Sequence, residues 1–247
     1  MDIGVRDHVF VVGGGTQGLG LATATELVRE GAKVLVVSRS QENVEAAVEA
    51  LGVESAAGLA ADLSDPAAPA QAVSAALARF GRLDGALVNT GGPPPAPVEQ
   101  LDDELWEDAT RSTLIGPVRL ARHVITHLTG TDGTGGSLVF VLSTSARNPL
   151  RGLALSNALR PGVAMHVKDL ADAYGGGERP VRVNALLPGS FRTSRAGVGP
   201  FDTTGVPLGR IGQPAEFGRV AAFVLSPAAS YLTGSLVPVD GGRLRSL

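Results

Sequence analysis

The sequence predicts an α/β fold in which a doubly wound, mostly parallel sheet of about seven strands lies between two layers of helices, a three-layer α/β/α arrangement. First, short runs of β-branched residues alternate along the chain with longer, alanine-rich segments of helical periodicity. Second, these runs are almost continuously apolar, as expected of parallel strands that are covered on both faces. Third, the first run ends in a cluster of glycines and leads directly into a helical pattern.

Each strand is predicted by an apolar run bounded by glycine, proline or polar residues. HVFVV at 8–12 and KVLVVS at 33–38 are the clearest, because Val, Leu and Phe dominate them. Similar runs predict the later strands at 56–61, 84–89, 136–143, 182–188 and 235–240.

Segments with a helical spacing of apolar residues separate these strands. They lie near residues 18–30, 41–51, 66–80, 101–129, 154–174 and 214–226. Because strand, helix and strand follow one another, the connections cross over and the strands run parallel. The sequence shows no internal repeat or linker, so we expect one domain over residues 1–247. A Gly- and Thr-rich stretch predicts a mobile flap near 190–212.

Composition narrows the classes of partner. The 247 residues carry 21 Lys and Arg against 24 Asp and Glu, and the positive residues are scattered. Charge therefore gives no reason to expect nucleic acid or an anionic membrane as a partner. The chain has no cysteine for a disulfide or a thiolate, and no apolar leader or membrane-spanning run. We expect a cytoplasmic protein whose ligand is a small molecule.

The glycine cluster in VFVVGGGTQGLGLATATELVREGAKVLVVSR carries the strongest chemical signal. Gly13, Gly15 and Gly18 fit G-x-G-x-x-G, while Gly14, Gly18 and Gly20 fit an overlapping G-x-x-x-G-x-G. In either pattern the missing side chains let a pyrophosphate approach the backbone at a helix N-terminus. The motif predicts a Rossmann-like, dinucleotide-binding sheet. The alternative is a glycine-rich turn that holds no ligand.

The end of the second strand bears on the choice of cofactor. An NAD-selective site favours a carboxylate there, but the chain has Ser38, Arg39 and Ser40, with no acid before Glu42. Arg39 could pair with a 2′-phosphate, so we favour NADP(H) over NAD(H). The alternative is an exposed arginine at the start of a helix.

The tail PLGRIGQPAEFGRVAAFVLSPAASYLTGSLVPVDGG (207–242) adds to these motifs. With them, the chain resembles the short-chain dehydrogenase/reductase family over almost its whole length, and the tail is similar to that of β-ketoacyl acyl-carrier-protein reductases. The resemblance implies an NADP(H)-dependent, 3-oxoacyl reductase-like oxidoreductase that acts on a carbonyl or alcohol. It also implies a homo-oligomer, either a dimer or a tetramer.

The resemblance assigns cofactor contacts residue by residue. It places Asp62 and Leu63 at the adenine, although Asp62 could instead cap the next helix. The Asn89–Gly92 stretch matches an Asn-Asn-Ala-Gly motif imperfectly, and the segment after residue 187 would lie against the nicotinamide. Together with Ser38 and Arg39 from the end of the second strand, the candidate cofactor contacts are Gly14, Thr16, Gln17, Gly18, Leu19, Gly20, Asp62, Leu63, Asn89, Thr90, Gly91, Pro188, Gly189 and Thr193.

The catalytic group of the family, Asn, Ser, Tyr and Lys, carries over only in part. Ser143 matches the serine that holds the substrate oxygen. Ser156 stands in place of the tyrosine, Arg160 in place of the lysine and Thr113 in place of the asparagine. Because general acid catalysis contributes about 10²–10⁴-fold, these exchanges would slow reduction without affecting cofactor binding. Pro161 follows at once, so we expect the helix to be kinked or to begin late.

Two classes of function follow. The first is an oxidoreductase that uses Ser143 with an ordered water, Arg160 or a substrate group in place of the tyrosine. The second is a dinucleotide-binding sensor or structural subunit without the reaction. Arg147 and Arg151 could reach the pocket rim and bind an acidic substrate, or be solvated loop arginines. His123 and His127 have metal-ligand spacing, but no third ligand lies nearby in the sequence, so we expect no metal.

Overall fold

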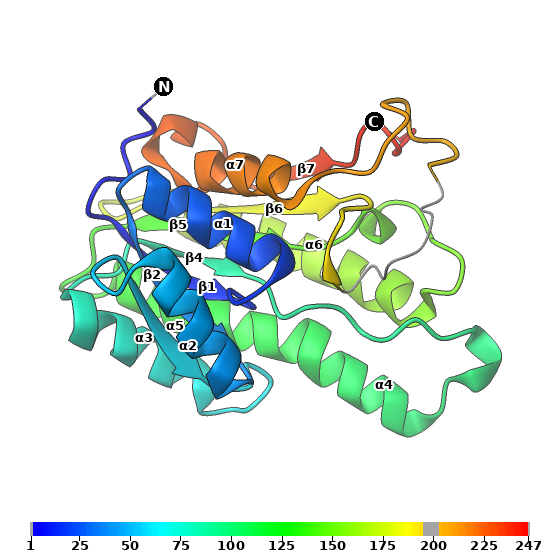
Figure 1. Cartoon of the computed structure of the whole chain (residues 1–247), viewed down its shortest axis with the longest axis horizontal. Coiled ribbons are helices and arrows are strands. Elements are labelled where there is room, and N and C mark those ends of the chain that lie inside the picture. Colours follow the sequence, from blue (N-terminus) through cyan, green and yellow to red (C-terminus); the bar gives the residue numbers. More distant parts are fainter. Residues whose placement is uncertain (1, 195–202, 247) are drawn as a thin grey trace.

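The computed structural model describes residues 2–194 and 203–246, which form one seven-stranded sheet (Figure 1). Every strand pair is parallel, and the order across the sheet is β3-β2-β1-β4-β5-β6-β7. All seven predicted strands are confirmed. Their bounds are β1 Val9–Gly13, β2 Lys33–Ser38, β3 Ala56–Ala60, β4 Gly85–Val88, β5 Gly136–Val141, β6 Val181–Pro188 and β7 Leu236–Val239.

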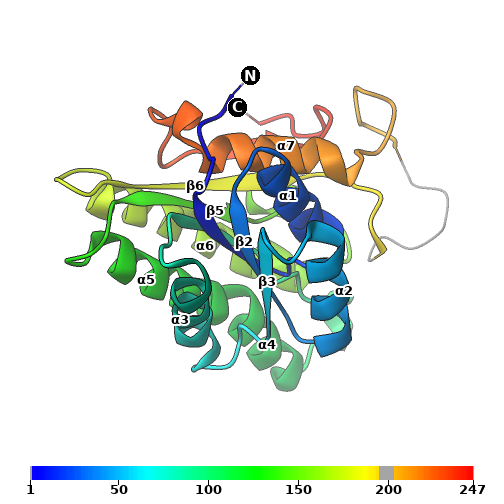
Figure 2. The same ribbon diagram turned by 60° about the vertical axis from the view of Figure 1, so that its left-hand side comes forward.

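Helices cover both faces of the sheet, so the three-layer arrangement is also confirmed (Figure 2). The α-helices are α1 Gly18–Arg29, α2 Gln41–Leu51, α3 Ala68–Phe80, α4 Asp103–Thr110, α5 Gly116–Thr129, α6 Ala154–Tyr174 and α7 Pro214–Leu225. Short 3-10 turns lie at η1 Val98–Gln100, η3 Thr144–Ala146 and η5 Pro227–Ala229. The segment predicted as one helix at 101–129 contains a π-helical turn, η2 Arg111–Ile115, between α4 and α5. None of the helices described has the length and apolarity that a membrane crossing requires.

The core consists of two apolar clusters, one on each face of the sheet. In β1, Val9 and Val11 belong to the cluster under α3, α5 and α6, whereas Phe10 and Val12 belong to the cluster under α1 and α7. Successive side chains of a strand point to opposite faces, so a continuous apolar run supplies both clusters. This use of both faces explains the pattern on which the strand predictions rest.

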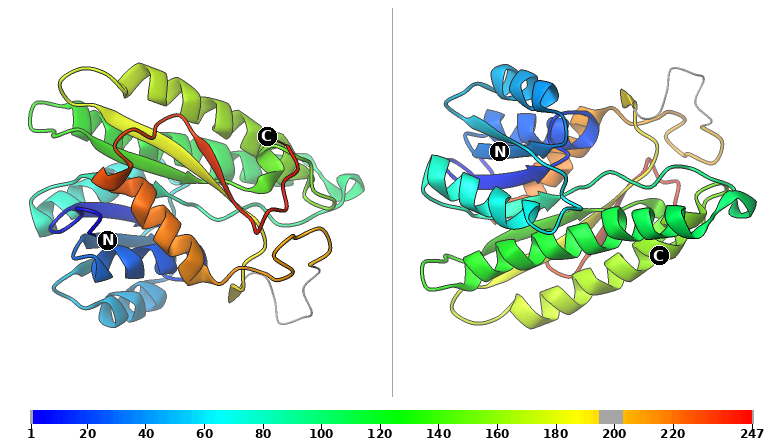
Figure 3. Two further views of the ribbon diagram at one scale, coloured as in Figure 1. Left: turned by 90° about the horizontal axis from the view of Figure 1, so that it is seen from above. Right: turned by 90° about the horizontal axis from the view of Figure 1, so that it is seen from below.

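The strand order reverses direction between β1 and β4. From β1 the chain proceeds outward through β2 and β3, then returns to β4 on the other side of β1. In such sheets a crevice opens at this point, beyond the carboxyl ends of the strands, and ligands bind there. The right-hand view of Figure 3 shows α5 (green) and α6 (yellow-green) over the same face of the sheet.

Helix α6 corrects one expectation. It begins at Ala154 and continues without interruption to Tyr174, with Pro161 inside it, so the expected late start is wrong. A proline costs a helix interior roughly 3 kcal/mol, chiefly through a lost hydrogen bond and a steric clash. The buried face of α6, which includes Val163, Ala164 and Val167, offsets that cost by packing under the sheet.

The predicted flap at 190–212 is described only at its two ends, since residues 195–202 lie outside the described residues. The ends are joined by a bridge between Phe191 and Gly212. On α7, Glu216 accepts hydrogen bonds of 2.9 and 2.7 Å from the Arg210 guanidinium, which lowers the pKa of Glu216 to about 2. The flap is therefore anchored at both ends, and its mobility stays a prediction.

Candidate active site

The turn between β1 and α1 is built from glycines that cannot carry side chains. Gly14 and Gly18 have φ angles of +56° and +55°, in the left-handed region that favours glycine. A Cβ atom on Gly20 would collide with the carbonyl oxygen of Gly14. The overlapping G-x-x-x-G-x-G pattern thus corresponds to three backbone positions where the structure requires glycine.

Helix α1 begins at this turn with an N-terminus suited to an anion. Its first turn holds no acidic residue, and within the described chain the Gln17 side chain makes no capping hydrogen bond. The buried hydroxyl of Thr16 has no hydrogen-bond partner among the described residues. Unpaired N–H groups and the helix dipole favour negative charge at such an end. These features fit the pyrophosphate of a dinucleotide.

The end of β4 holds the glycine turn in place. The Asn89 side-chain amide donates a hydrogen bond of 3.1 Å to the carbonyl oxygen of Gly13. The hydroxyl of the next residue, Thr90, donates to the carbonyl oxygen of Ser112 in η2 at 2.8 Å. Two residues of the imperfect Asn-Asn-Ala-Gly match therefore connect β4 to β1 and to the π-helical turn.

The segment after β6 reaches the same turn from the other side. The Thr193 side chain packs within about 3.4 Å of the position that a Cβ atom on Gly18 would occupy. The hydroxyl of Ser194 donates to the side-chain oxygen of Gln17 at 3.2 Å. Gly189, at the end of β6, lies so close to the backbone of Asp240 that no Cβ atom fits there.

At the β2 end of the crevice, Arg39 is exposed directly after the strand. The Asp62 carboxylate accepts a hydrogen bond of 2.9 Å from the backbone N–H of Ser64. Helix α3 begins only at Ala68, so the alternative that Asp62 caps that helix is wrong. Leu63 is buried in the core beneath the glycine turn.

Ser143 follows β5 and starts the short turn η3. Its hydroxyl oxygen accepts a hydrogen bond of 3.1 Å from the backbone N–H of Ser145. Because this contact uses only a lone pair, the hydroxyl hydrogen of the half-buried Ser143 can still be donated to another oxygen.

Ser156 lies deeper and is 6% exposed. Its hydroxyl oxygen is 2.9 Å from that of Ser145 and accepts a hydrogen bond of 3.1 Å from Nε of Arg160. Ser143, Ser145, Ser156 and Arg160 therefore form one continuous polar chain. Sequence reasoning missed Ser145, and its only signal was its place in the STS stretch after β5.

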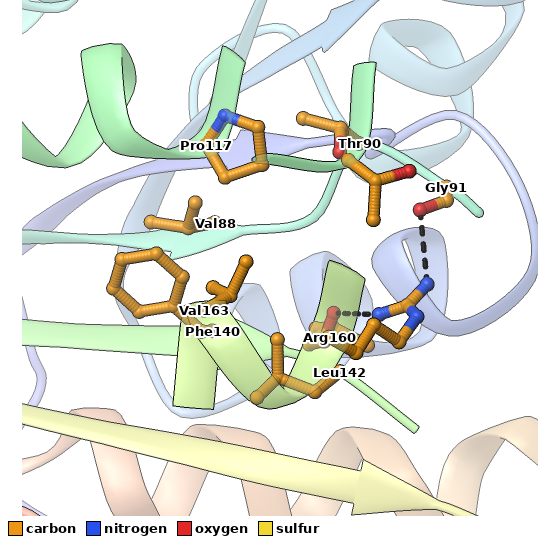
Figure 4. Close-up of a pocket in the computed structure, with 10 residues that line it drawn as sticks. Val88, Thr90, Gly91, Pro117, Phe140, Leu142, Arg160 and Val163 are labelled. Carbon is orange, nitrogen blue, oxygen red and sulfur yellow. Dashed lines mark hydrogen bonds between the residues drawn. The ribbon is translucent and has the colours of Figure 1, made fainter. Parts of the chain in front are cut away.

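Arg160 is buried, with 7% of its surface exposed. Nη1 donates to the carbonyl oxygen of Val141 at 2.9 Å, and Nη2 donates to that of Gly91 at 3.2 Å (Figure 4). All three guanidinium nitrogens thus contact acceptors of the protein itself. Arg160 connects α6 to the ends of β4 and β5.

Thr113 lies in the π-helical turn and is 4% exposed. Its hydroxyl has no hydrogen-bond partner among the described residues. It lines a cavity of about 10 Å³. Figure 4 shows Thr90 and Arg160, which belong to the same lining. About 10–15 Å³ is the smallest space that admits a water molecule.

The structure separates the two loop arginines. Nη2 of Arg147 donates to the carbonyl oxygen of Leu236 at 3.0 Å, so this side chain extends to β7 and is not a fully solvated loop arginine. Arg151 is exposed and lines a groove beside the start of α6. Within the described chain, no group of three or more His, Asp or Glu side chains is arranged to hold a metal.

Comparisons with known proteins agree with this geometry. Residues 14–243 match a family model described as enoyl-(acyl carrier protein) reductase. The chain is 32% identical over 250 residues to an uncharacterized oxidoreductase of Mycobacterium tuberculosis, covering 96% of this chain and 92% of the relative. It is 30% identical over 244 residues to cis-4-hydroxycyclohexanecarboxylate dehydrogenase of Sinomonas cyclohexanicum, covering 96% of each.

A solved structure is similarly close. The 3-ketoacyl-(acyl-carrier-protein) reductase from Brucella melitensis, solved in complex with NADH, has a TM-score of 0.89 and 32% sequence identity. The match covers 97% of this chain and 99% of that one.

The buried position of Arg160 generates a stability prediction. Arg160→Met should lower the free energy of unfolding by about 1.5–3 kcal/mol, the range for a hydrogen bond to a charged group, because buried carbonyl oxygens lose their donor. Urea unfolding followed by circular dichroism measures this. Arg122→Met, at an exposed position of α5, is the matched control. Equal stability of the two variants would contradict a structural role for Arg160.

Proposed function

We propose, on the premise that this chain belongs to the short-chain dehydrogenase/reductase family, that it is an NADP(H)-dependent, 3-oxoacyl reductase-like enzyme with an altered proton path. Members of the family are oxidoreductases that act on carbonyl or alcohol substrates. The observation that carries the proposal is a glycine cradle, with an unpartnered Thr16 hydroxyl, on the same sheet edge as the retained Ser143.

The glycine turn and the N-terminus of α1 would hold the pyrophosphate, with Asn89 keeping the turn in place. The bound nicotinamide supplies or accepts hydride. The Brucella melitensis relative was solved with NADH, so the preference for NADP(H) in this chain rests on Arg39 and on the lack of an acid beside it. An exposed arginine directly after β2 supports pairing with a 2′-phosphate.

Among the residues of the chain, Ser143 is the group that we assign to the substrate oxygen. Its oxygen already accepts from Ser145, which leaves its hydrogen for the substrate. We assign Ser156 and Arg160 to holding this arrangement rather than to proton transfer. A serine hydroxyl is a weak acid, and a guanidinium does not lose a proton in a protein. The proton would therefore come from water or from a group of the substrate.

The alternative is a protein that binds the dinucleotide without turnover. One observation favours it: the side chains in the tyrosine and lysine positions are engaged with the protein rather than directed to open space. Thr113, in the asparagine position, is buried as well. Measurements of binding and of turnover on one preparation separate the two functions.

We also propose that the chain forms a dimer or tetramer through its long helices. Met165 on α6 is 67% exposed and Ile115, beside α5, is 39% exposed, and such apolar surface favours an interface. Analytical ultracentrifugation at micromolar concentration should show a dimer or larger. Met165→Glu should shift it toward smaller species, whereas Val53→Glu, at a position 59% exposed after α2, should not. A monomeric wild type would overturn this proposal.

Cofactor preference is tested by calorimetry. We expect NADPH to bind more tightly than NADH, because only the former presents a 2′-phosphate to Arg39. Arg39→Ala should reduce the preference by about tenfold, which corresponds to one charge-assisted hydrogen bond. Arg219→Ala, at an exposed position on α7, is the control. Equal affinity in the wild type, or an NADPH preference that Arg39→Ala leaves unchanged, would contradict the assignment.

Turnover is tested with NADPH and a panel containing 4-oxocyclohexanecarboxylate, its methyl ester and acetoacetyl coenzyme A. We expect slow reduction, about 10²–10⁴-fold below enzymes that have a general acid in place. Ser143→Ala should abolish the remaining rate while NADPH affinity is retained, and Ser74→Ala, at an exposed position of α3, should change neither. Tight NADPH binding with no turnover of any substrate in wild type would support the non-catalytic alternative.

A further inference from the structure

A groove of about 360 Å³ opens beside the site. Its walls come from the two loops that flank the polar chain, one following β4 and the other connecting Ser143 to Ser156. Small-molecule sites in proteins have volumes of about 300–1,000 Å³ and are mostly apolar. The side chains that matter for recognition here are Ala96, Val98, Pro149, Leu150, Arg151 and Asn157.

The walls of the groove are fixed to one another. A parallel bridge joins Ala96 to Leu153 across it. The Asn157 side chain donates to the carbonyl oxygen of Leu150 and accepts from its backbone N–H, both at 2.9 Å. Both the oxygen and the nitrogen of the Asn157 side-chain amide are therefore hydrogen-bonded to the backbone of Leu150, and the amide supports this wall of the groove.

Arg151 stands at the corner of a tight turn in this fixed loop. The backbone N–H of Leu153 donates to the carbonyl oxygen of Leu150 at 3.3 Å, and the intervening Gly152 has a φ of +71°. This geometry is that of a turn whose third position needs glycine. Hydrogen bonds of Leu150 to Leu153 and to Asn157 thus fix the backbone around Arg151. The Arg151 side chain therefore leaves the loop at a fixed position.

The Arg151 guanidinium differs from the other two arginines near the site. Arg147 donates to a carbonyl of β7 and Arg160 is buried against β4 and β5. Arg151 is exposed, and no side-chain hydrogen bond or ion pair joins it to the described residues. A mostly apolar groove with one uncommitted cation at its edge suits a ligand with an apolar body and one anionic group.

The single exposed guanidinium in the described lining of the groove supports a ligand with one anionic group. One cation pairs with one negative charge, and further charges on the ligand would have no matching cation among the described residues that line the groove. A carboxylate also offers the two oxygens that match the fork of a guanidinium.

We infer, building on the proposed function, that this groove is a substrate subsite for a ketone or secondary alcohol with a small apolar skeleton and one free carboxylate. Arg151 pairs with that carboxylate and determines specificity. The apolar wall from Ala96 to Val98 and from Pro149 to Leu150 receives the skeleton, which leaves the reacting carbon on the side of Ser143.

A binding experiment tests the subsite without requiring turnover. Isothermal calorimetry compares cyclohexanecarboxylate with cyclohexanecarboxamide, which has the same shape and no charge, in the presence of saturating NADPH. We expect the acid to bind more tightly, and Arg151→Gln to weaken acid binding by about tenfold without changing amide binding. Arg151→Lys should retain part of the preference, because it keeps the charge and loses the fork. Arg122→Gln, at an exposed position on α5, is the control.

The remaining outcomes separate the two proposals. Equal affinity for acid and amide, or Arg151→Gln binding the acid as tightly as wild type at an unchanged melting temperature, overturns the subsite. The subsite proposal is also overturned if acetoacetyl coenzyme A competes for the groove better than the free acid does. If the acid binds through Arg151 but no substrate of the panel is reduced, neither oxo acid, ester nor acetoacetyl coenzyme A, the proposed function fails and the subsite stands. If oxo acids and their methyl esters are reduced equally, and Arg151→Gln has no effect on either, the subsite fails and the proposed function stands.

Discussion

The buried guanidinium of Arg160 is the interaction on which the site depends. Taking a cation out of water costs several kcal/mol, and this cost is met only when the donors find good acceptors. Here the acceptors are backbone carbonyl oxygens at the ends of β4 and β5 and a hydroxyl on α6 itself. One side chain thereby fixes the distance between the two strand ends and the helix that crosses beneath them. Helix α6 continues past Pro161 to Tyr174, although the proline lacks a backbone donor.

This arrangement divides the two serine hydroxyls between two tasks. Ser156 accepts from Arg160 and lies against Ser145, so its position is set from inside the protein. Ser143 touches that network only through the backbone N–H of Ser145 and keeps its hydrogen available. Ser156 and Ser145 therefore lie between Arg160 and Ser143 in this series of hydrogen bonds. The position of Ser143 is set by the backbone N–H of Ser145, with Ser156 and Arg160 packed behind it.

The sheet and helices could be predicted because local sequence pattern determines them. Val9, Phe10, Val11 and Val12 supply two cores in alternation, so the whole run is apolar, and that continuous run is visible in the sequence. Whether an arginine near the site is buried and hydrogen-bonded could not be predicted, because the partners of Arg160 and Arg147 are distant in sequence. Nη1 of Arg160 reaches a carbonyl 19 residues away, and Nη2 reaches one 69 residues away. The partner of Arg147 is 89 residues away. The π-helical turn that buries Thr113 was missed as well, since no periodicity distinguishes it from the helix around it.

Two contributions to lowering the activation barrier, general acid catalysis and substrate positioning, bear on whether the reaction is altered or lost. Removing a general acid costs about 10²–10⁴-fold, or roughly 3–5 kcal/mol of barrier. Holding two reactants in a productive geometry contributes about 7–11 kcal/mol, and this part depends on the cradle and the substrate wall rather than on the acid. The glycine turn, Asn89 and the groove loop are all in place in this chain. The exchange of Tyr and Lys for Ser156 and Arg160 would remove the smaller of these two contributions. The proposal of catalysis by a different proton route, rather than binding without turnover, therefore rests on the larger one.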